Sequence, residues 1–191
     1  MASAREAAAL KSAEFHCSAF DVPAVSTDQL IEMLRRVDDT ARPVLVDVRT
    51  AAERQVARVP GALSRSEFEA KIADFGDSDV VVMCIMAAST PSLERPRGMR
   101  PVGTVGRRSG QYAADVQKRG VCKRVWNSHG ICAYSHHNDA FGDGPQALVD
   151  DAGAPATRVH VYARPWDFAS DRFEAVRFGP IGAVAAMWRR D

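Results

Sequence analysis

The sequence predicts an α/β fold in three layers, with a central parallel sheet flanked by helices. Two observations lead to this prediction. The runs 44–48 and 79–84 are apolar and β-branched throughout, which is typical of strands buried on both faces of a parallel sheet. Segments with apolar residues at helical spacing alternate with such runs, as in a series of βαβ units. Folds of this kind bind ligands beyond the carboxyl ends of their strands.

Each element follows from a local signal. Ser26 and Thr27 offer a helix N-cap ahead of apolar residues at helical spacing, and Gly120 offers a helix stop. Residues 87–103 hold prolines, glycines and arginines without apolar periodicity, so an exposed, disordered loop is expected there. The expected elements are a helix from about 28 to 36–39, a strand at 44–48, a helical turn at 51–56, a helix at 66–72, a strand at 79–84, a helix at 106–119, and strands at 121–126 and 157–162.

Composition restricts the class of protein. A chain of 191 residues predicts one domain, and a formal net charge of +1 argues against a nucleic-acid partner. No apolar run approaches the roughly 20 residues of a membrane span, so no membrane partner is expected. Four cysteines without a C-x-x-C pair indicate reduced thiols and a cytoplasmic protein, with an organellar transit peptide left open by the Ala-rich N-terminus.

Cys84 is the first candidate for a reactive group, because it ends the strongest predicted strand. The helix expected after it would place backbone N–H groups, with Arg107 and Arg108, near the sulfur. Such surroundings lower the pKa of a thiol and favour the nucleophilic thiolate. The alternative, at about even odds from position alone, is an inert cysteine buried in the core.

Four segments occur in a telling order. They are Leu45-Val46-Asp47-Val48-Arg49 with Glu53 and Val59-Pro60-Gly61-Ala62; Val80-Val81-Val82-Met83-Cys84; Gly106-Arg107-Arg108-Ser109-Gly110-Gln111-Tyr112-Ala113; and Val125 to Tyr134. In this order they resemble the signatures of the rhodanese family of sulfurtransferases. Near the C-terminus, residues 159–162 and 166–167 are similar to an extension found in some single-domain members, so the whole match covers about residues 25–170.

The resemblance implies an organisation and a set of roles. Residues 1–24 would be an N-terminal extension, 25–140 the rhodanese-like domain, and 141–191 a C-terminal extension packed on it. The implied activity moves a sulfane sulfur through a persulfide, from a thiosulfate- or persulfide-type donor to a small thiophilic acceptor or a protein thiol, with no cofactor and no metal. The implied site residues are Cys84 as nucleophile, Arg108 as the catalytic arginine, Gly106, Arg107 and Ser109 in substrate binding, and Asp47 and Arg49 in support.

The sequence departs from the family in three places. Arg58 replaces the usual histidine before the Pro-Gly turn, and His129 and Tyr134 replace a glycine and a tryptophan of the closing segment. The third departure interrupts the active-site loop. The family has two residues between its cysteine and its glycine, whereas 21 stand between Cys84 and Gly106, so an insertion of 19 is expected at about 85–103.

The insertion leaves alternatives open. A retained intron and a lineage-specific insertion would both explain it. Misplacing a catalytic loop by about 1 Å can reduce a rate on the order of 100-fold. A catalytically impaired binding or regulatory module is therefore the alternative to the enzyme, and a redox-sensing thiol protein is a third, more distant hypothesis.

Other chemistries have weaker support. The spacing of His129, His136, His137 and His160 matches no zinc signature. A cysteine phosphatase needs an arginine six positions after its cysteine, and Thr90 stands there. Residues 103–106 lack the Lys-Ser/Thr ending of a phosphate-binding loop.

Overall fold

The computed structural model describes residues 4–18, 20–36, 42–85, 108–161 and 168–177. Their elements, in chain order, are α1 (Ala4–Cys17), β1 (Ala24–Val25), α2 (Thr27–Leu34), β2 (Val44–Asp47), α3 (Ala51–Val56), β3 (Leu63–Ser64), α4 (Arg65–Ala70), a 3₁₀ turn (Ile72–Phe75), β4 (Asp79–Met83), α5 (Arg108–Arg119), β5 (Arg124–Ser128), α6 (Ile131–Tyr134), a second 3₁₀ turn (Asn138–Ala140), β6 (Arg158–His160) and β7 (Glu174–Val176).

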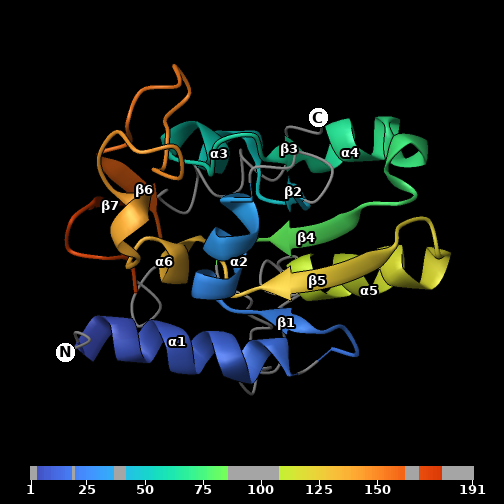
Figure 1. The fold of residues 1–191 in the computed structure, drawn as a ribbon. Coiled ribbons are helices and arrows are strands. Elements are labelled where there is room, and N and C mark those ends of the chain that lie inside the picture. Colours follow the sequence, from blue (N-terminus) through green and yellow to red (C-terminus); the bar gives the residue numbers. More distant parts are fainter. Residues whose placement is uncertain (1–3, 19, 37–41, 86–107, 162–167, 178–191) are drawn as a thin grey trace, which may run out of the picture.

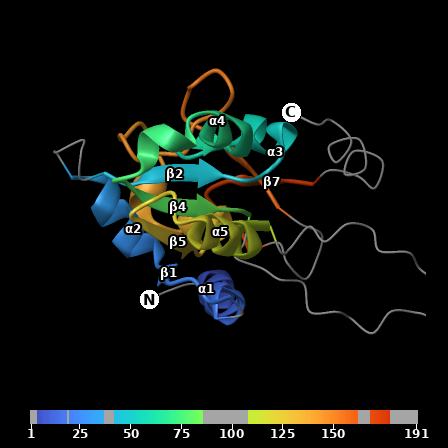
Figure 2. The same cartoon turned by 90° about the vertical axis from the view of Figure 1, so that its right-hand side faces the viewer.

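The central sheet has five strands in the order β1-β5-β4-β2-β3, and every neighbouring pair is parallel. A separate parallel pair, β6 and β7, lies beside it. Figures 1 and 2 show α1 along the β1 edge of the sheet, with α3 and α4 toward the β3 edge. The predicted α/β class and its parallel sheet are therefore confirmed.

The helices cover both faces of the sheet because the strand residues alternate between two apolar clusters. Val80 and Val82 of β4 pack with Phe68 of α4 and with Tyr112, Ala113 and Val116 of α5. On the opposite face, Leu45, Val81 and Met83 pack with Leu30 and Ile31 of α2, with Ile131 and Tyr134 of α6, and with Val159 of β6. Strands buried in this way must be apolar throughout, which is the pattern that predicted them.

Capping residues fix where three of the helices begin. Ser26, Thr50 and Ser64 each accept a hydrogen bond from the backbone N–H three residues on, and a Gln or Glu at that position bonds back to the cap. These reciprocal bonds satisfy N–H groups that the first turn of a helix leaves unpaired. At the other end of α5, Gly120 has φ +61, the left-handed conformation of a helix stop.

Several elements differ from the sequence prediction. The predicted helix 66–72 ends at Ala70 and passes into a 3₁₀ turn, and β5 begins at Arg124 rather than at residue 121. Sequence analysis missed α1, β1, β3, α6 and β7, of which all but α1 are short. Helices and strands of two to four residues carry too few positions to show a period.

The N-terminal segment contributes to the body of the fold. Helix α1 contacts α6, and the Sγ of Cys17 lies 3.8 Å from the carbonyl oxygen of Asn127 in β5. Val22 and Val25 are buried in the two clusters, one on each face. Strand β1 therefore extends the sheet, and helix α1 covers that edge.

The predicted insertion lies almost entirely outside the described residues, which resume at Arg108. Its first residue is an exception. Ile85 is fully buried in the core cluster that contains Val81 and Met83, and its carbonyl accepts a 2.9 Å hydrogen bond from the backbone of Cys132. Ile85 therefore belongs to the core just beyond the end of β4.

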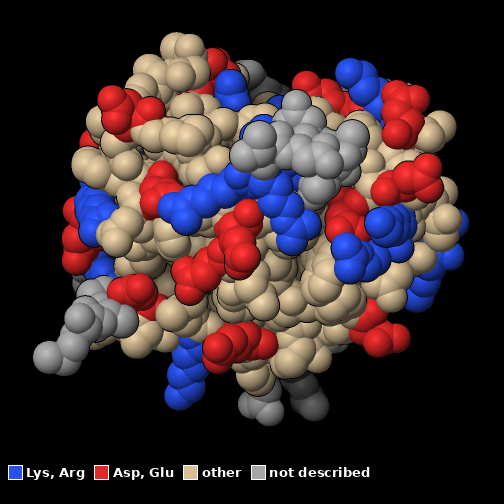
Figure 3. Space-filling view, viewed as in Figure 1, with Lys and Arg blue, Asp and Glu red and all other residues tan. Residues whose placement is uncertain are grey.

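None of the helices in the described part of the chain has the length and apolar character needed to cross a bilayer. On the face seen in Figure 3, acidic and basic side chains of the described residues are intermixed. This mixture agrees with the near-neutral net charge of the chain.

Candidate active site

Cys84 lies at the carboxyl end of β4, the middle strand of the sheet. Its side chain is 3% exposed and packs in the cluster that α4 and α5 cover. Its carbonyl accepts a 2.8 Å hydrogen bond from the backbone N–H of Ile131, at the start of α6. The sulfur thus lies on the face of the sheet that α4 and α5 cover, at the predicted end of the strand, while the backbone of Cys84 is tied to α6.

The predicted supporting residues lie on the neighbouring strand. Asp47 is in register with Met83, and the N–H of Val48 donates to the carbonyl of Met83 at 3.0 Å, so β2 reaches the level of Cys84. The next residue, Arg49, folds back on Asp47: its Nε lies 2.9 and 3.1 Å from the two carboxylate oxygens, and its Nη2 lies 2.6 Å from one of them. Both side chains are fully buried.

Arg49 also ties this pair to the segment that follows. Its Nη2 donates to the carbonyl of Ala57 at 2.6 Å, and its Nη1 donates to the carbonyl of Glu53 at 3.4 Å. A buried ion pair needs hydrogen bonds of this kind, because two charges removed from water are not compensated by each other alone. The Asp47–Arg49 pair therefore holds the turn between β2 and α3 beside the end of β4.

Glu53 and His160 complete the polar cluster, and sequence reasoning gave neither of them a role. Oε2 of Glu53 accepts bonds from the backbone N–H and the hydroxyl of Thr50 at 2.8 and 2.7 Å. Its other oxygen lies 3.2 Å from Nδ1 of His160 in β6. The capping pattern Thr50-x-x-Glu53 was readable in the sequence, whereas no local pattern placed His160 against α3.

The surroundings of Cys84 correct one expectation. We expected a lowered thiol pKa, but burial raises the pKa of Cys84 to about 12, and the negative charges of Glu53 and Asp47 act in the same direction. A hydrogen bond from the backbone of Ile85 and the charge of Arg49 lower the pKa of Cys84, but they do not offset the effect of burial. Within the described residues, Cys84 is a protonated thiol at neutral pH.

The remaining predicted residues stand at the amino end of α5. Gly106 and Arg107 lie outside the described residues, and Arg108 begins the helix, with its side chain outside them too. Ser109 is 1% exposed, and its hydroxyl has no hydrogen-bond partner among the residues that the structure describes. The structure thus brings Cys84 together with Asp47 and Arg49, and the roles of the α5 residues stay predictions.

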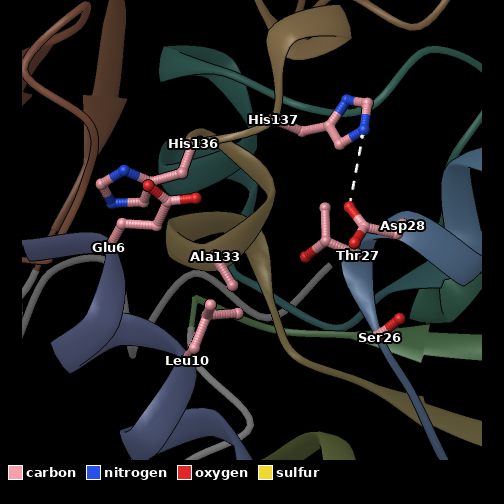
Figure 4. Close-up of a pocket in the computed structure, with 8 residues that line it drawn as sticks. All are labelled: Glu6, Leu10, Ser26, Thr27, Asp28, Ala133, His136 and His137. Carbon is pink, nitrogen blue, oxygen red and sulfur yellow. Dashed lines mark ion pairs between the residues drawn. The ribbon is translucent and has the colours of Figure 1, made fainter. Parts of the chain in front are cut away.

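A separate small cavity of about 100 Å³ lies between α1, α2 and α6. Figure 4 shows its lining, in which His137 and Asp28 face each other at 3.6 Å. The Nε2 of His136 lies 2.7 Å from the carbonyl oxygen of Phe168. The other lining residues are Glu6, Leu10, Ser26, Thr27 and Ala133. This cavity shares no residue with the Cys84 cluster, and the described residues contain no His/Cys/Asp/Glu group suited to a metal ion.

Comparison with known proteins finds similarity to solved structures only. No family model matches the chain, and no curated protein matches it. Solved structures that resemble it include SSP1007 from Staphylococcus saprophyticus subsp. saprophyticus, at 18% identity and a TM-score of 0.42 over 61% of this chain and 97% of that one. Another is a rhodanese-like domain protein from Staphylococcus aureus, at 16% identity and a TM-score of 0.42 over 61% and 95%.

The structural neighbours are rhodanese-like domain proteins. At these identities the likeness concerns the path of the backbone, and it assigns no chemistry to Cys84.

Proposed function

We propose that this protein is a rhodanese-like sulfurtransferase that carries a sulfane sulfur on Cys84. The observation that carries the proposal is the position of Cys84, which ends the central strand next to the buried Asp47–Arg49 pair. Ligands of parallel α/β sheets bind at this edge, and a cysteine there can serve as a nucleophile.

The reaction has two displacements. The Cys84 thiol loses its proton, and the thiolate attacks the outer sulfur of a donor such as thiosulfate. The sulfur–sulfur bond of thiosulfate breaks, sulfite leaves with the bonding electron pair, and Cys84 holds a persulfide. A thiophilic acceptor, such as cyanide or a thiolate, then attacks the outer sulfur and releases the Cys84 thiolate. The cycle needs no external oxidant or reductant, because each sulfur transfer returns the electron pair to the leaving group.

A specific observation favours a second candidate, a binding or regulatory rhodanese-like module without turnover. Cys84 is 3% exposed and its pKa is raised to about 12, so the described surroundings suppress the nucleophile that the first displacement requires. The 21 residues between Cys84 and Gly106 act in the same direction if they keep the α5 segment away from the sulfur.

Thiocyanate formation from thiosulfate and cyanide separates the two candidates. The assay compares the full chain with a deletion of residues 86–104, which leaves Cys84-Ile85-Val105-Gly106 and restores the spacing of two. This deletion retains Ile85, whose side chain is fully buried. Cys84→Ser is the matched loss variant, and Cys122→Ser is its control, because Cys122 is a partly exposed thiol whereas Cys84 is buried.

Each outcome assigns a function. Thiocyanate from the full chain, lost in Cys84→Ser and retained in Cys122→Ser, supports the enzyme. Thiocyanate from the deletion variant alone supports a competent fold that the insertion disables. If both proteins are folded and neither transfers sulfur from thiosulfate or from a glutathione persulfide, the enzyme proposal is wrong and the binding module replaces it.

A further inference from the structure

The ion pair between His160 and Glu53 joins the C-terminal part of the chain to the candidate site. Nδ1 of His160 lies 3.2 Å from Oε1 of Glu53, and the two side chains are only 6% and 8% exposed. His160 belongs to β6, which packs on α3, the helix that contains Glu53. A pair this buried is shielded from water and salt, so its charges act strongly on their surroundings.

Glu53 is held in its ionised form. Burial opposes ionisation, but hydrogen bonds from His160 and Thr50 outweigh it and lower the pKa of Glu53 to about 2. The Thr50 contacts occupy Oε2, which leaves Oε1 for His160. The orientation of the carboxylate is therefore fixed from both sides.

The charged groups facing Cys84 come from three elements and partly cancel. The β2 end contributes Asp47 and Arg49, which pair with each other. Helix α3 contributes Glu53, whose negative charge is the largest electrostatic influence on the thiol after burial. Strand β6 contributes His160 through its contact with Glu53. From α5, Tyr112 directs its hydroxyl to Glu69 at 2.6 Å, away from this group.

We propose that the His160–Glu53 pair controls how readily the Cys84 thiol loses its proton, so that β6 acts as an electrostatic regulator of the candidate site. His160 acts through Glu53 and is a positioning residue. The biological meaning of this control rests on the proposed function of Cys84. The electrostatic effect itself can be measured independently, because a thiol reacts with an alkylating agent whether or not it transfers sulfur.

The two members of the pair have opposite effects on the thiol. The carboxylate of Glu53 repels a developing Cys84 thiolate, and the contact with His160 offsets part of that repulsion. Replacing His160 with glutamine leaves the carboxylate uncompensated and disfavours the thiolate. Replacing Glu53 with glutamine removes the repulsion and favours the thiolate. In the double variant, Glu53→Gln has already removed the carboxylate, so His160→Gln should have no further effect on the thiol.

The test measures the rate at which iodoacetamide alkylates Cys84, resolved by mass spectrometry of the peptide that contains it, between pH 7 and 10. Relative to the unmodified chain, we expect roughly a tenfold slower reaction for His160→Gln and roughly a tenfold faster one for Glu53→Gln, as about one pKa unit implies. The double variant should stay within about threefold of Glu53→Gln.

Two controls separate this effect from loosened packing. His137→Gln removes a histidine that pairs with Asp28 at 3.6 Å, and it should leave the Cys84 rate unchanged. Circular dichroism and thermal unfolding establish that each variant is folded. Loosened packing would expose Cys84 and accelerate alkylation in every variant, so only an electrostatic effect gives opposite directions for the two single variants.

An unchanged rate in a folded His160→Gln variant would overturn the proposal, as would a slower rate in Glu53→Gln. Absence of sulfur transfer from both donors, in the folded full chain and in the folded deletion variant, contradicts the sulfurtransferase function and leaves this alkylation result unaffected. The two proposals therefore fail independently.

Discussion

The buried pair of Asp47 and Arg49 gives the sharpest prediction about stability. Asp47→Asn keeps the shape of the side chain but removes the charge that faces Arg49 through contacts of 2.6 to 3.1 Å. Both side chains are fully buried, so the guanidinium cannot turn to water. It retains only the carbonyls of Ala57 and Glu53 as acceptors.

Breaking one side of a buried ion pair costs about 3–5 kcal/mol in unfolding free energy. With a urea m-value of about 2 kcal/mol/M, the unfolding midpoint of Asp47→Asn should fall by about 1.5–2.5 M. The assay is urea unfolding followed by far-UV circular dichroism. Asp171→Asn is the control: it removes the exposed partner of Arg5, and surface changes of this kind usually stay within about 0.5 kcal/mol.

A double variant, Asp47→Asn with Arg49→Met, tests the reason for the loss. It removes the uncompensated charge, so it should recover much of the stability that Asp47→Asn loses. An Asp47→Asn variant within about 1 kcal/mol of the unmodified chain would refute the argument, because it would mean that the guanidinium is not confined by its surroundings.

Two further predictions concern Glu53 and the end of α5. The pKa of Glu53 is about 2 in the fold, below its unfolded value of about 4.3, so the stability it contributes is present above about pH 5 and disappears as the pH falls toward 2. The urea unfolding midpoint should therefore decrease less between pH 7 and pH 3 in Glu53→Gln than in the unmodified chain. An equal decrease in both proteins would contradict a lowered pKa of Glu53 in the fold. Gly120 has φ +61 with open space around its Cα, so Gly120→Ala should cost about 1 kcal/mol through backbone strain alone. The control is Gly76→Ala, where the backbone has no positive φ and nothing lies within 4 Å; equal thermal midpoints for the two variants would show that the strain is absent.

Elements α2, β2, β4 and α5 were predictable because their residues carry the signal themselves, whereas the 14-residue helix α1 was missed. The runs 44–48 and 79–84 correspond to β2 and β4, and Ser26 and Gly120 mark the predicted ends of α2 and α5. The short elements β1, β3 and α6 were not predictable, because two to four residues become a strand or a helix only through the neighbours that pair with them.

The candidate site likewise has features that the sequence predicted and features that it did not. The position of Cys84 and its closeness to Asp47 and Arg49 follow from strand order, since two parallel neighbours end at the same edge of the sheet. The raised pKa of Cys84 was not predictable. It depends on how deeply the sulfur is buried and on which charges surround it, and these are properties of packing.

The sequence by itself determined the class of fold, the strand at whose end Cys84 lies and the spacing of 21 residues between Cys84 and Gly106. These are local properties, written in hydrophobic period, capping residues and residue counts. Only the tertiary structure placed His160, more than a hundred residues after Glu53, against the same buried carboxylate. Contacts between distant segments are decided by the packing of the whole chain, so the charges that govern the thiol become visible only in the folded molecule.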